Sequence, residues 1–167
     1  LNFQQKLFHL GQRSISNKGY YEAVTWSFTD QKIDDLTNDS TNPIFIINPI
    51  SKELNVLRRS IFSNLLFYLK KNHDRGFQDI SLFEIGPVFY GKKPGEQQTV
   101  IGAVKSGQIN KKSWSEKTRN IDIFDMKTDV IKTLIEIGIN ADHLIVSDKS
   151  QSCYHPGRSA SINLKTD

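Results

Sequence analysis

Two strand-like segments in the middle of the chain place the strongest constraint on the fold. Residues 80–90 and residues 99–105 are rich in the β-branched and aromatic side chains that favour strands. Between them lies a run of turn-forming residues, residues 91–95 (GKKPG). Two strands joined by a turn of this kind predict an antiparallel hairpin with a loop of several residues.

Helices are predicted on both sides of the hairpin. Residues 3–17 carry apolar side chains at helical spacing. Ser60 can cap a second helix, whose apolar side chains include Ile61, Leu65, Leu66 and Leu69. A third helix is expected to start at Asp125 or Thr128. The chain therefore combines long helices with antiparallel strands.

Shorter strands complete the predicted pattern. Alternation over residues 22–28 predicts a half-buried strand that has on one face Val24, Trp26 and Phe28. Residues 44–47 predict a short, fully buried strand, and residues 143–146 and 159–164 predict two more. Several antiparallel strands with long helices between them are typical of an α+β fold, in which helices flank a mainly antiparallel sheet.

The length of the chain suits one domain, and we predict a single domain over residues 1–167. The chain starts at Leu1 and stops just after a strand-like segment, so we expect a truncated part of a longer polypeptide. No apolar run reaches the roughly 18 residues that span a bilayer, and the N-terminus lacks the features of a secretion signal. We therefore expect a cytoplasmic protein with no membrane partner.

Motifs for the common cofactors are missing. The sequence contains neither a P-loop nor a glycine-rich dinucleotide fingerprint. Asp122, Asp125 and Asp129 form an acidic trio near a predicted helix start, where negative charge is favourable without a metal ion. Cys153, the only cysteine, lies two residues from His155, but a free cysteine is usually a small buried hydrophobe, and a hydrolase based on this pair is the weakest alternative. We predict no catalytic, cofactor-binding or metal-binding residue.

Two adjacent arginines, Arg58 and Arg59, precede the second predicted helix. They can bind a phosphate or a carboxylate of a partner. The structural alternative, which we favour, places one arginine in a buried ion pair and the other in solvent. Glu84 lies among apolar neighbours on a predicted strand and needs a cationic partner, Arg58 or Arg59, if it is buried. We select Arg58 and Glu84 as the candidate structural ion pair.

The net charge of +4 and the pI near 9.1 permit contact with RNA. The basic residues are divided among a helix end, a turn and a loop: Lys70, Lys71 and Arg75; Lys92 and Lys93; Lys111, Lys112, Lys117 and Arg119. Few aromatic side chains lie near them, so a platform for stacking bases is not supported. A stand-alone RNA-binding module that contacts the phosphate backbone is the alternative function.

Five short segments, in this order, resemble the phenylalanyl-tRNA synthetase beta subunits of the bacterial type. They are residues 19–28 (GYYEAVTWSF), residues 48–51 (NPIS) with Leu57 and Arg58, residues 82–86 (LFEIG), residues 122–127 (DIFDMK) and residues 155–160 (HPGRSA). Each segment alone is weak evidence, but five in the family's order over residues 19–164 are hard to explain by chance.

The resemblance implies a fold similar to the core of a class II aminoacyl-tRNA synthetase. In that family the catalytic centre lies on the alpha subunit, and the beta subunit's version of the core packs against it in a heterotetramer of two alpha and two beta subunits. The complete enzyme attaches phenylalanine to its tRNA using ATP and magnesium, neither of which is expected to bind this fragment. The implied role is a non-catalytic structural module whose partners are the alpha subunit and, in the full complex, tRNA.

The resemblance also implies a docking surface, because helices form a bundle between the subunits of this family. Ile61, Leu65 and Leu69 are therefore candidate interface residues. The same three side chains can instead belong to the domain's own core, and both possibilities are kept.

Tyr90 bears on catalysis. An active class II core has an arginine at the end of its second-motif strand, where it binds the phosphates of ATP and of the acyl intermediate. By analogy with the alpha subunit, Tyr90 occupies that position here. A neutral phenol does not replace a guanidinium group that binds phosphate through two hydrogen bonds. The fragment alone is therefore predicted to be inactive, although the whole subunit belongs to a ligase.

Overall fold

The computed structural model describes residues 2–38, 42–110, 114–115 and 117–165. The chain groups into two compact units. One consists of residues 1–20 and 107–167, and the other of residues 21–106. We call them the terminal unit and the central unit. The predicted single domain over residues 1–167 stays a prediction, and each unit is described separately.

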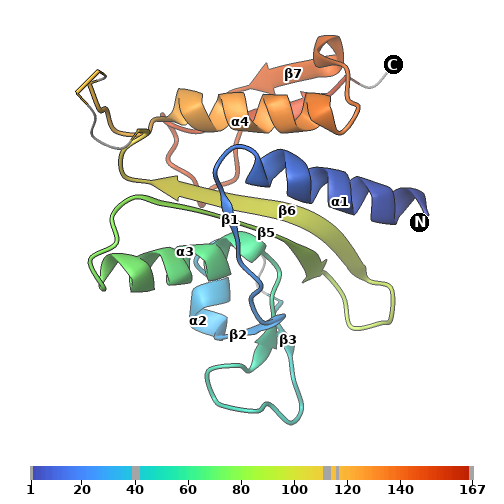
Figure 1. Ribbon diagram of the computed structural model, residues 1–167. Helices are drawn as coiled ribbons and strands as arrows, with labels where there is room; N and C mark the ends of the chain where they lie inside the picture. The colour runs from blue at the N-terminus through green and yellow to red at the C-terminus, as the bar shows by residue number, and fades with distance from the viewer. Residues whose placement is uncertain (1, 39–41, 111–113, 116, 166–167) are drawn as a thin grey trace. The chain divides into compact units, whose positions relative to one another are not determined.

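The hairpin predicted from the sequence forms the centre of the central unit (Figure 1). Strand β5 (Ile80–Phe89) pairs with β6 (Gln97–Ser106) in antiparallel register along their whole lengths. The short strand β1 (Tyr21–Glu22) joins β5 in parallel, which gives the strand order β1-β5-β6. The prediction of an antiparallel hairpin is confirmed.

Helix α3 (Ile61–His73) packs on this sheet and makes the main hydrophobic core. The helix begins where predicted, because the Ser60 side chain accepts a hydrogen bond from the backbone N–H of Phe62 (3.1 Å). Ile61 and Leu65 are fully buried against Val104 of β6. Gly102 of β6 permits this close approach, because a Cβ atom there would lie 2.8 Å from Cγ2 of Ile61.

A second, smaller sheet has the antiparallel order β2-β4-β3. Its strands are β2 (Phe28–Thr29), β3 (Ile44–Phe45) and β4 (Val56–Leu57). Helix α2 (Gln31–Asp34) follows β2 and is capped by Asp30 through a 2.7 Å hydrogen bond from the backbone N–H of Lys32. The prediction that residues 44–47 are fully buried is wrong, because Phe45 and Ile47 are exposed.

The predicted half-buried strand over residues 22–28 is also wrong. The chain leaves the first sheet after β1 and enters the second at β2, so the intervening residues belong to neither. Val24 and Trp26 are exposed by 91% and 60%, while the side chain of Thr25 turns inward to bind Glu84. A buried carboxylate requires a hydrogen-bond donor, and this requirement reverses the face expected from hydrophobic alternation.

The terminal unit pairs two helices, α1 (Phe3–Ser16) and α4 (Ile123–Glu136) (Figure 1). After α4 come the short helix η1 (Ala141–His143) and the antiparallel strands β7 (Leu144–Ser147) and β8 (Ser161–Leu164). Helix α4 does not start at Asp125 or Thr128 as predicted. Asp122 is its N-cap, and Asp125 completes a capping box, so the first turn begins earlier than the apolar spacing suggested.

Polar contacts connect α4 with the N-terminal segment within the terminal unit. Glu136 accepts hydrogen bonds from Lys18 (2.6 Å) and from the hydroxyl of Ser14. The hydrogen bond from Lys18, supported by that from Ser14, lowers the pKa of Glu136. Tyr20 donates a hydrogen bond to Asp129 (2.8 Å), and its burial together with this contact raises its pKa.

A lowered pKa makes stability depend on pH. The ionised form of Glu136 is favoured in the folded state, so its contribution is present above the unfolded-state pKa and is lost as the pH falls through the folded-state value. We expect Glu136→Gln to destabilise the terminal unit at pH 7 and to be indistinguishable from wild type well below about pH 4. Urea unfolding followed by circular dichroism at several pH values measures this difference. A difference independent of pH would contradict the assigned cause.

Close packing of α3 on β6 predicts that Gly102→Ala destabilises the central unit by about 1–3 kcal/mol, since the added methyl group overlaps Ile61. The matched control is Gly157→Ala, whose methyl group would lie no closer than 3.7 Å to any neighbour and should change stability by less than about 0.5 kcal/mol. Equal effects of the two substitutions in urea unfolding would show that the packing argument is wrong.

Candidate functional site

Arg58 and Glu84 form a buried ion pair in the central unit. Nη1 of Arg58 lies 2.6 Å from Oε1 of Glu84, and the two side chains are 2% and 4% exposed. Nε of Arg58 also donates a hydrogen bond to the carbonyl oxygen of Pro87 (2.9 Å). These are the two residues that the sequence analysis paired, and the structure brings them together from β5 and the segment between β4 and α3.

Two further side chains complete the hydrogen bonding of this pair. The hydroxyl of Thr25 donates to Oε2 of Glu84 (2.7 Å) and accepts from Nη1 of Arg58 (3.0 Å). Nδ2 of Asn64 donates to the same hydroxyl (3.1 Å) and to the carbonyl oxygen of Trp26 (3.0 Å). The pair therefore connects residues from β5, α3 and the segment between β1 and β2.

Gly86 is required by the position of this arginine. A Cβ atom at residue 86 would lie 2.5 Å from Nη2 of Arg58, well inside contact distance. The glycine of the LFEIG segment thus leaves room for the guanidinium group of Arg58 next to strand β5.

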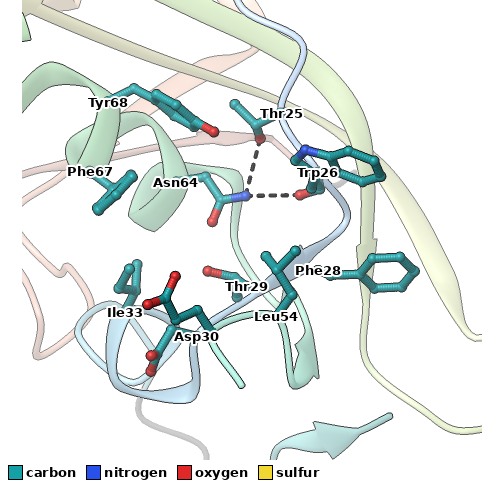
Figure 2. Close-up of a pocket in the computed structure, with 11 residues that line it drawn as sticks. Thr25, Trp26, Phe28, Thr29, Asp30, Ile33, Leu54, Asn64, Phe67 and Tyr68 are labelled. Atoms are coloured by element: carbon teal, nitrogen blue, oxygen red, sulfur yellow. Dashed lines mark hydrogen bonds between the residues drawn. The ribbon is translucent and has the colours of Figure 1, made fainter. Parts of the chain in front are cut away.

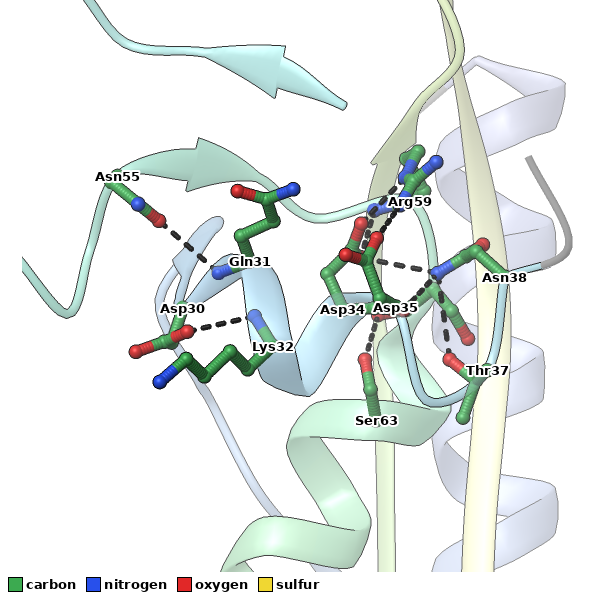
Figure 3. Close-up of polar contacts among 11 residues, drawn as sticks. Asp30, Gln31, Lys32, Asp34, Asp35, Thr37, Asn38, Asn55, Arg59 and Ser63 are labelled. Carbon is green, nitrogen blue, oxygen red and sulfur yellow. Dashed lines mark hydrogen bonds and ion pairs between the residues drawn. The ribbon is translucent and has the colours of Figure 1, made fainter. Parts of the chain in front are cut away.

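Arg59 has a second set of carboxylate partners (Figure 3). Its Nε lies 2.5 Å from Oδ2 of Asp34, and its Nη2 lies 2.7 Å from Oδ1 of Asp35. Asp34 is fully buried and also accepts a hydrogen bond from the backbone N–H of Arg59 (2.9 Å). The expectation that the second arginine lies in solvent is wrong, because a buried aspartate on the short helix α2 needs a cation.

Sequence reasoning missed Asp34, which lies in a run that contains several acidic residues. Asn38 also donates to Oδ1 of Asp34 (3.2 Å), so the carboxylate belongs to a local polar network (Figure 3).

A pocket of about 380 Å³ lies next to the ion pair (Figure 2). Its lining includes Thr25, which accepts a hydrogen bond from Arg58, and Asn64, which donates one to Thr25. The rest of the lining is mostly apolar and aromatic and includes the two carboxylates Asp30 and Glu53. Its other residues are Trp26, Phe28, Thr29, Ile33, Leu54, Phe67 and Tyr68. The sequence analysis assigned no residue to a pocket, because the pocket walls come from three separate segments, residues 25–33, 53–54 and 64–68.

The candidate interface residues occupy the core of the central unit. Ile61 and Leu65 are 1% and 0% exposed, and Leu69 is partly buried against the same cluster. Of the two possibilities kept in the sequence analysis, the domain's own core describes Ile61 and Leu65. These two side chains are not available on the surface of the chain to a docking partner.

The acidic trio and the pair Cys153 and His155 form separate contacts and no common site. Within the acidic trio, Asp122 and Asp125 cap α4 and Asp129 accepts the hydrogen bond from Tyr20. Among the described residues, no group of three or more His, Cys, Asp or Glu side chains is placed to hold a metal ion. The exposed thiol of Cys153 lies near Gln151, and Nδ1 of His155 accepts a hydrogen bond from the backbone N–H of Gly157.

The basic residues proposed for RNA contact are partly engaged by carboxylates. Lys70 pairs with Asp74 at the end of α3. Arg119 binds Asp125 (2.6 Å), and this hydrogen bond raises the pKa of the guanidinium group. Lys111 and Lys112 lie outside the described residues. None of the described helices is long and apolar enough to cross a membrane.

Tyr90 lies at the end of β5, directly after Phe89, and its side chain is 68% exposed. Its backbone N–H donates to the carbonyl oxygen of Glu96 (3.1 Å), which closes the loop of the hairpin. The end of this strand thus presents a phenol to solvent.

The fold resembles solved aminoacyl-tRNA synthetase structures. Pyrrolysyl-tRNA synthetase from Desulfitobacterium hafniense aligns with a TM-score of 0.64 at 14% identity, covering 89% of this chain and 50% of that chain. An ATP phosphoribosyltransferase regulatory subunit/histidyl-tRNA synthetase from Bacillus halodurans aligns with a TM-score of 0.61 at 11% identity, covering 86% of this chain and 35% of that one. The chain has the α+β fold of the class II synthetase core, as predicted.

Sequence comparison gives the family. Residues 1–167 match the profile described as phenylalanyl tRNA synthetase beta chain CLM domain, and the chain belongs to this family. The phenylalanine–tRNA ligase beta subunit of Paramagnetospirillum magneticum is 35% identical over 153 residues, which are 92% of this chain and 19% of that protein. The beta subunit of Rickettsia bellii is 36% identical over 154 residues, 92% of this chain and 18% of that protein. The chain thus spans about a fifth of the length of these relatives.

The buried ion pair yields a stability prediction. Arg58→Met leaves the carboxylate of Glu84 buried without a cation, and we expect a loss of about 3–5 kcal/mol in the free energy of unfolding. The double variant Arg58→Met/Glu84→Met should recover part of this loss, because no charge remains to be desolvated. Urea unfolding of the single and double variants measures both values.

The matched control for this prediction is Lys70→Met, which removes a cation from an exposed pair with Asp74. Exposed pairs of this kind contribute about 0–1 kcal/mol. A loss for Arg58→Met as small as that for Lys70→Met would contradict the role assigned to the buried pair.

Proposed function

We propose that this chain is a non-catalytic structural module of a phenylalanine–tRNA ligase beta subunit, and that it packs on the catalytic alpha subunit. The complete enzyme attaches phenylalanine to its tRNA using ATP and magnesium in the cytoplasm. The partners of the module are then the alpha subunit and, in the full complex, tRNA. Membership of the beta chain family and the class II fold support the assignment to this enzyme.

The observation that carries the non-catalytic role is the engagement of both arginines by internal carboxylates. A class II active site needs guanidinium groups that face the phosphates of ATP. Here Arg58 is bound to Glu84, and Arg59 is bound to Asp34 and Asp35. Release of either arginine would leave a buried carboxylate unpaired, which is unfavourable. Tyr90 offers no charge at the strand end, which supports a module that binds no nucleotide itself.

Exposed apolar side chains support the docking role. The β2-β4-β3 sheet and the segments next to it carry large hydrophobic side chains that are more than half exposed, among them Val24, Trp26, Phe45, Ile47 and Ile50. We call these five residues the apolar set. Solvent exposure of so many large apolar groups within residues 24–50 is typical of a surface covered by another protein. An obligate interface buries about 2,000 Å² or more, and the apolar set supplies part of such an area.

Substitutions in the apolar set test the docking role directly. Ile47 is 94% exposed and Val24 is 91% exposed, so Ile47→Asp and Val24→Asp leave the core of the module intact. We expect each to weaken binding of the alpha subunit from the same organism at least about tenfold, because a charge enters an apolar interface. Co-expression followed by size-exclusion chromatography with light scattering measures assembly, and circular dichroism verifies folding.

The control for this test is Lys149→Asp, an exposed substitution in the terminal unit that changes charge without removing an apolar group. Leu65→Asp is not informative, because Leu65 is buried and its loss disrupts the core. Failure of the wild-type chain to co-elute with the alpha subunit, in its full-length natural context, would contradict the proposal. RNA binding with a steep salt dependence would then favour the alternative of an RNA-binding module.

A further inference from the structure

Two polar residues of the pocket lining, Asn64 and Thr29, are largely buried, and each leaves a side-chain oxygen accessible at the pocket. Asn64 is 5% exposed, and its amide orientation is fixed because Nδ2 donates to the carbonyl oxygen of Trp26. Its Oδ1 accepts no hydrogen bond from any described residue. Thr29 is 4% exposed, and its hydroxyl likewise makes no side-chain hydrogen bond there. Figure 2 shows both oxygens pointing into the pocket.

Two carboxylates belong to the same lining, and no lysine or arginine does. Asp30 accepts a hydrogen bond from the backbone N–H of Lys32 through Oδ1. Within the described residues, neither Asp30 nor Glu53 forms an ion pair. The pocket thus presents two negative charges and an amide oxygen without a compensating cation. Such a set of acceptors is complementary to a cation that carries several N–H donors.

Aromatic rings line the rest of the pocket. Trp26 comes from the segment before β2, and Phe67 and Tyr68 come from α3 (Figure 2). Aromatic faces attract guanidinium and ammonium groups, and guanidinium also stacks on them. Aromatic walls therefore favour the same kind of occupant as the carboxylates.

We propose that the pocket binds an arginine side chain of the polypeptide that docks on the apolar set. A guanidinium group has five N–H donors in a plane, which suits acceptors spread over Asn64, Asp30 and Glu53. An ammonium group has three donors and is more strongly hydrated, so lysine suits the aromatic walls less well. Trp26 lines the pocket and also belongs to the apolar set, so a polypeptide that covers this surface reaches the pocket.

This inference rests on the proposed function, because the docked polypeptide is taken to be the alpha subunit. The pocket determines the orientation in which the partner binds the apolar set. Apolar contacts alone permit many orientations of a partner, whereas a charged group in a shaped pocket fixes one. Phosphate and other anions are excluded as occupants by the sign of the lining charges.

Site-specific photo-crosslinking tests the inference in the natural full-length polypeptide, assembled with its alpha subunit. Phe67 lines the pocket and is 45% exposed, so p-benzoylphenylalanine is introduced in its place. We expect ultraviolet light to attach this residue to an alpha-subunit peptide in which an arginine lies within a few positions of the attachment site. Mass spectrometry of the digested product identifies the peptide.

Charge removal provides the second arm of the experiment. In the Asp30→Asn/Glu53→Gln background, the crosslink yield to that peptide should fall at least about tenfold, since charge-assisted hydrogen bonds to guanidinium are lost. The control is Asp148→Asn, which removes one exposed carboxylate of the terminal unit and should leave the yield unchanged. Substitution of the identified arginine by citrulline, which keeps the shape and removes the charge, should reproduce the loss.

The outcomes separate the two proposals. Assembly of the subunits without any crosslink, a crosslink to a peptide that lacks a nearby arginine, or a yield insensitive to Asp30→Asn/Glu53→Gln would overturn the pocket assignment and leave the docking role in place. Absence of assembly in the wild-type complex would overturn both. A crosslink to the beta polypeptide itself would show that the arginine comes from another part of the same chain, and would also overturn the assignment to the partner.

Discussion

The arrangement of the central unit depends on the buried contact between Arg58 and Glu84. Burial of two charges costs several kcal/mol per ion, and their attraction compensates only when the remaining hydrogen-bonding positions are also filled. Thr25, Asn64 and the carbonyl oxygen of Pro87 fill them. The ion pair therefore fixes the positions of β5, α3 and the segment that joins the two sheets, and these elements are the frame of the unit.

The same contact determines what the unit exposes. Because the hydroxyl of Thr25 turns inward to Glu84, its neighbours Val24 and Trp26 turn outward. Because the amide nitrogen of Asn64 is used by Thr25 and Trp26, its oxygen is left facing the pocket. An internal requirement for hydrogen bonds thus produces both an apolar surface and a polar pocket next to it. The exposed apolar side chains and the pocket have a common physical origin.

The elements that could be predicted from the sequence are those whose contacts are local or repeat regularly. The β5–β6 hairpin follows from two apolar runs and a glycine-containing turn, and α3 follows from its cap and apolar spacing. The segment around Thr25 could not be predicted, because its direction depends on a carboxylate 59 residues away. Asp34 could not be identified, because it lies among other acidic residues and the sequence does not show which of them is buried. The pairing of Arg58 with Glu84 could be predicted from the sequence, because a glutamate within an apolar strand requires a cation.

Because Arg58 and Arg59 are paired internally, the partner that we propose for the central unit is expected to bind it mainly through apolar burial. Each buried Å² of apolar surface contributes about 25 cal/mol, but association also loses translational, rotational and side-chain freedom. Only part of the burial energy therefore appears as affinity, and apolar contact alone discriminates poorly between orientations. In our proposal Asp30 and Glu53 improve this discrimination, because only one orientation of the partner aligns a cation with both carboxylates. If the module has no chemistry of its own, as we propose, affinity then comes from the apolar set and orientation comes from the pocket.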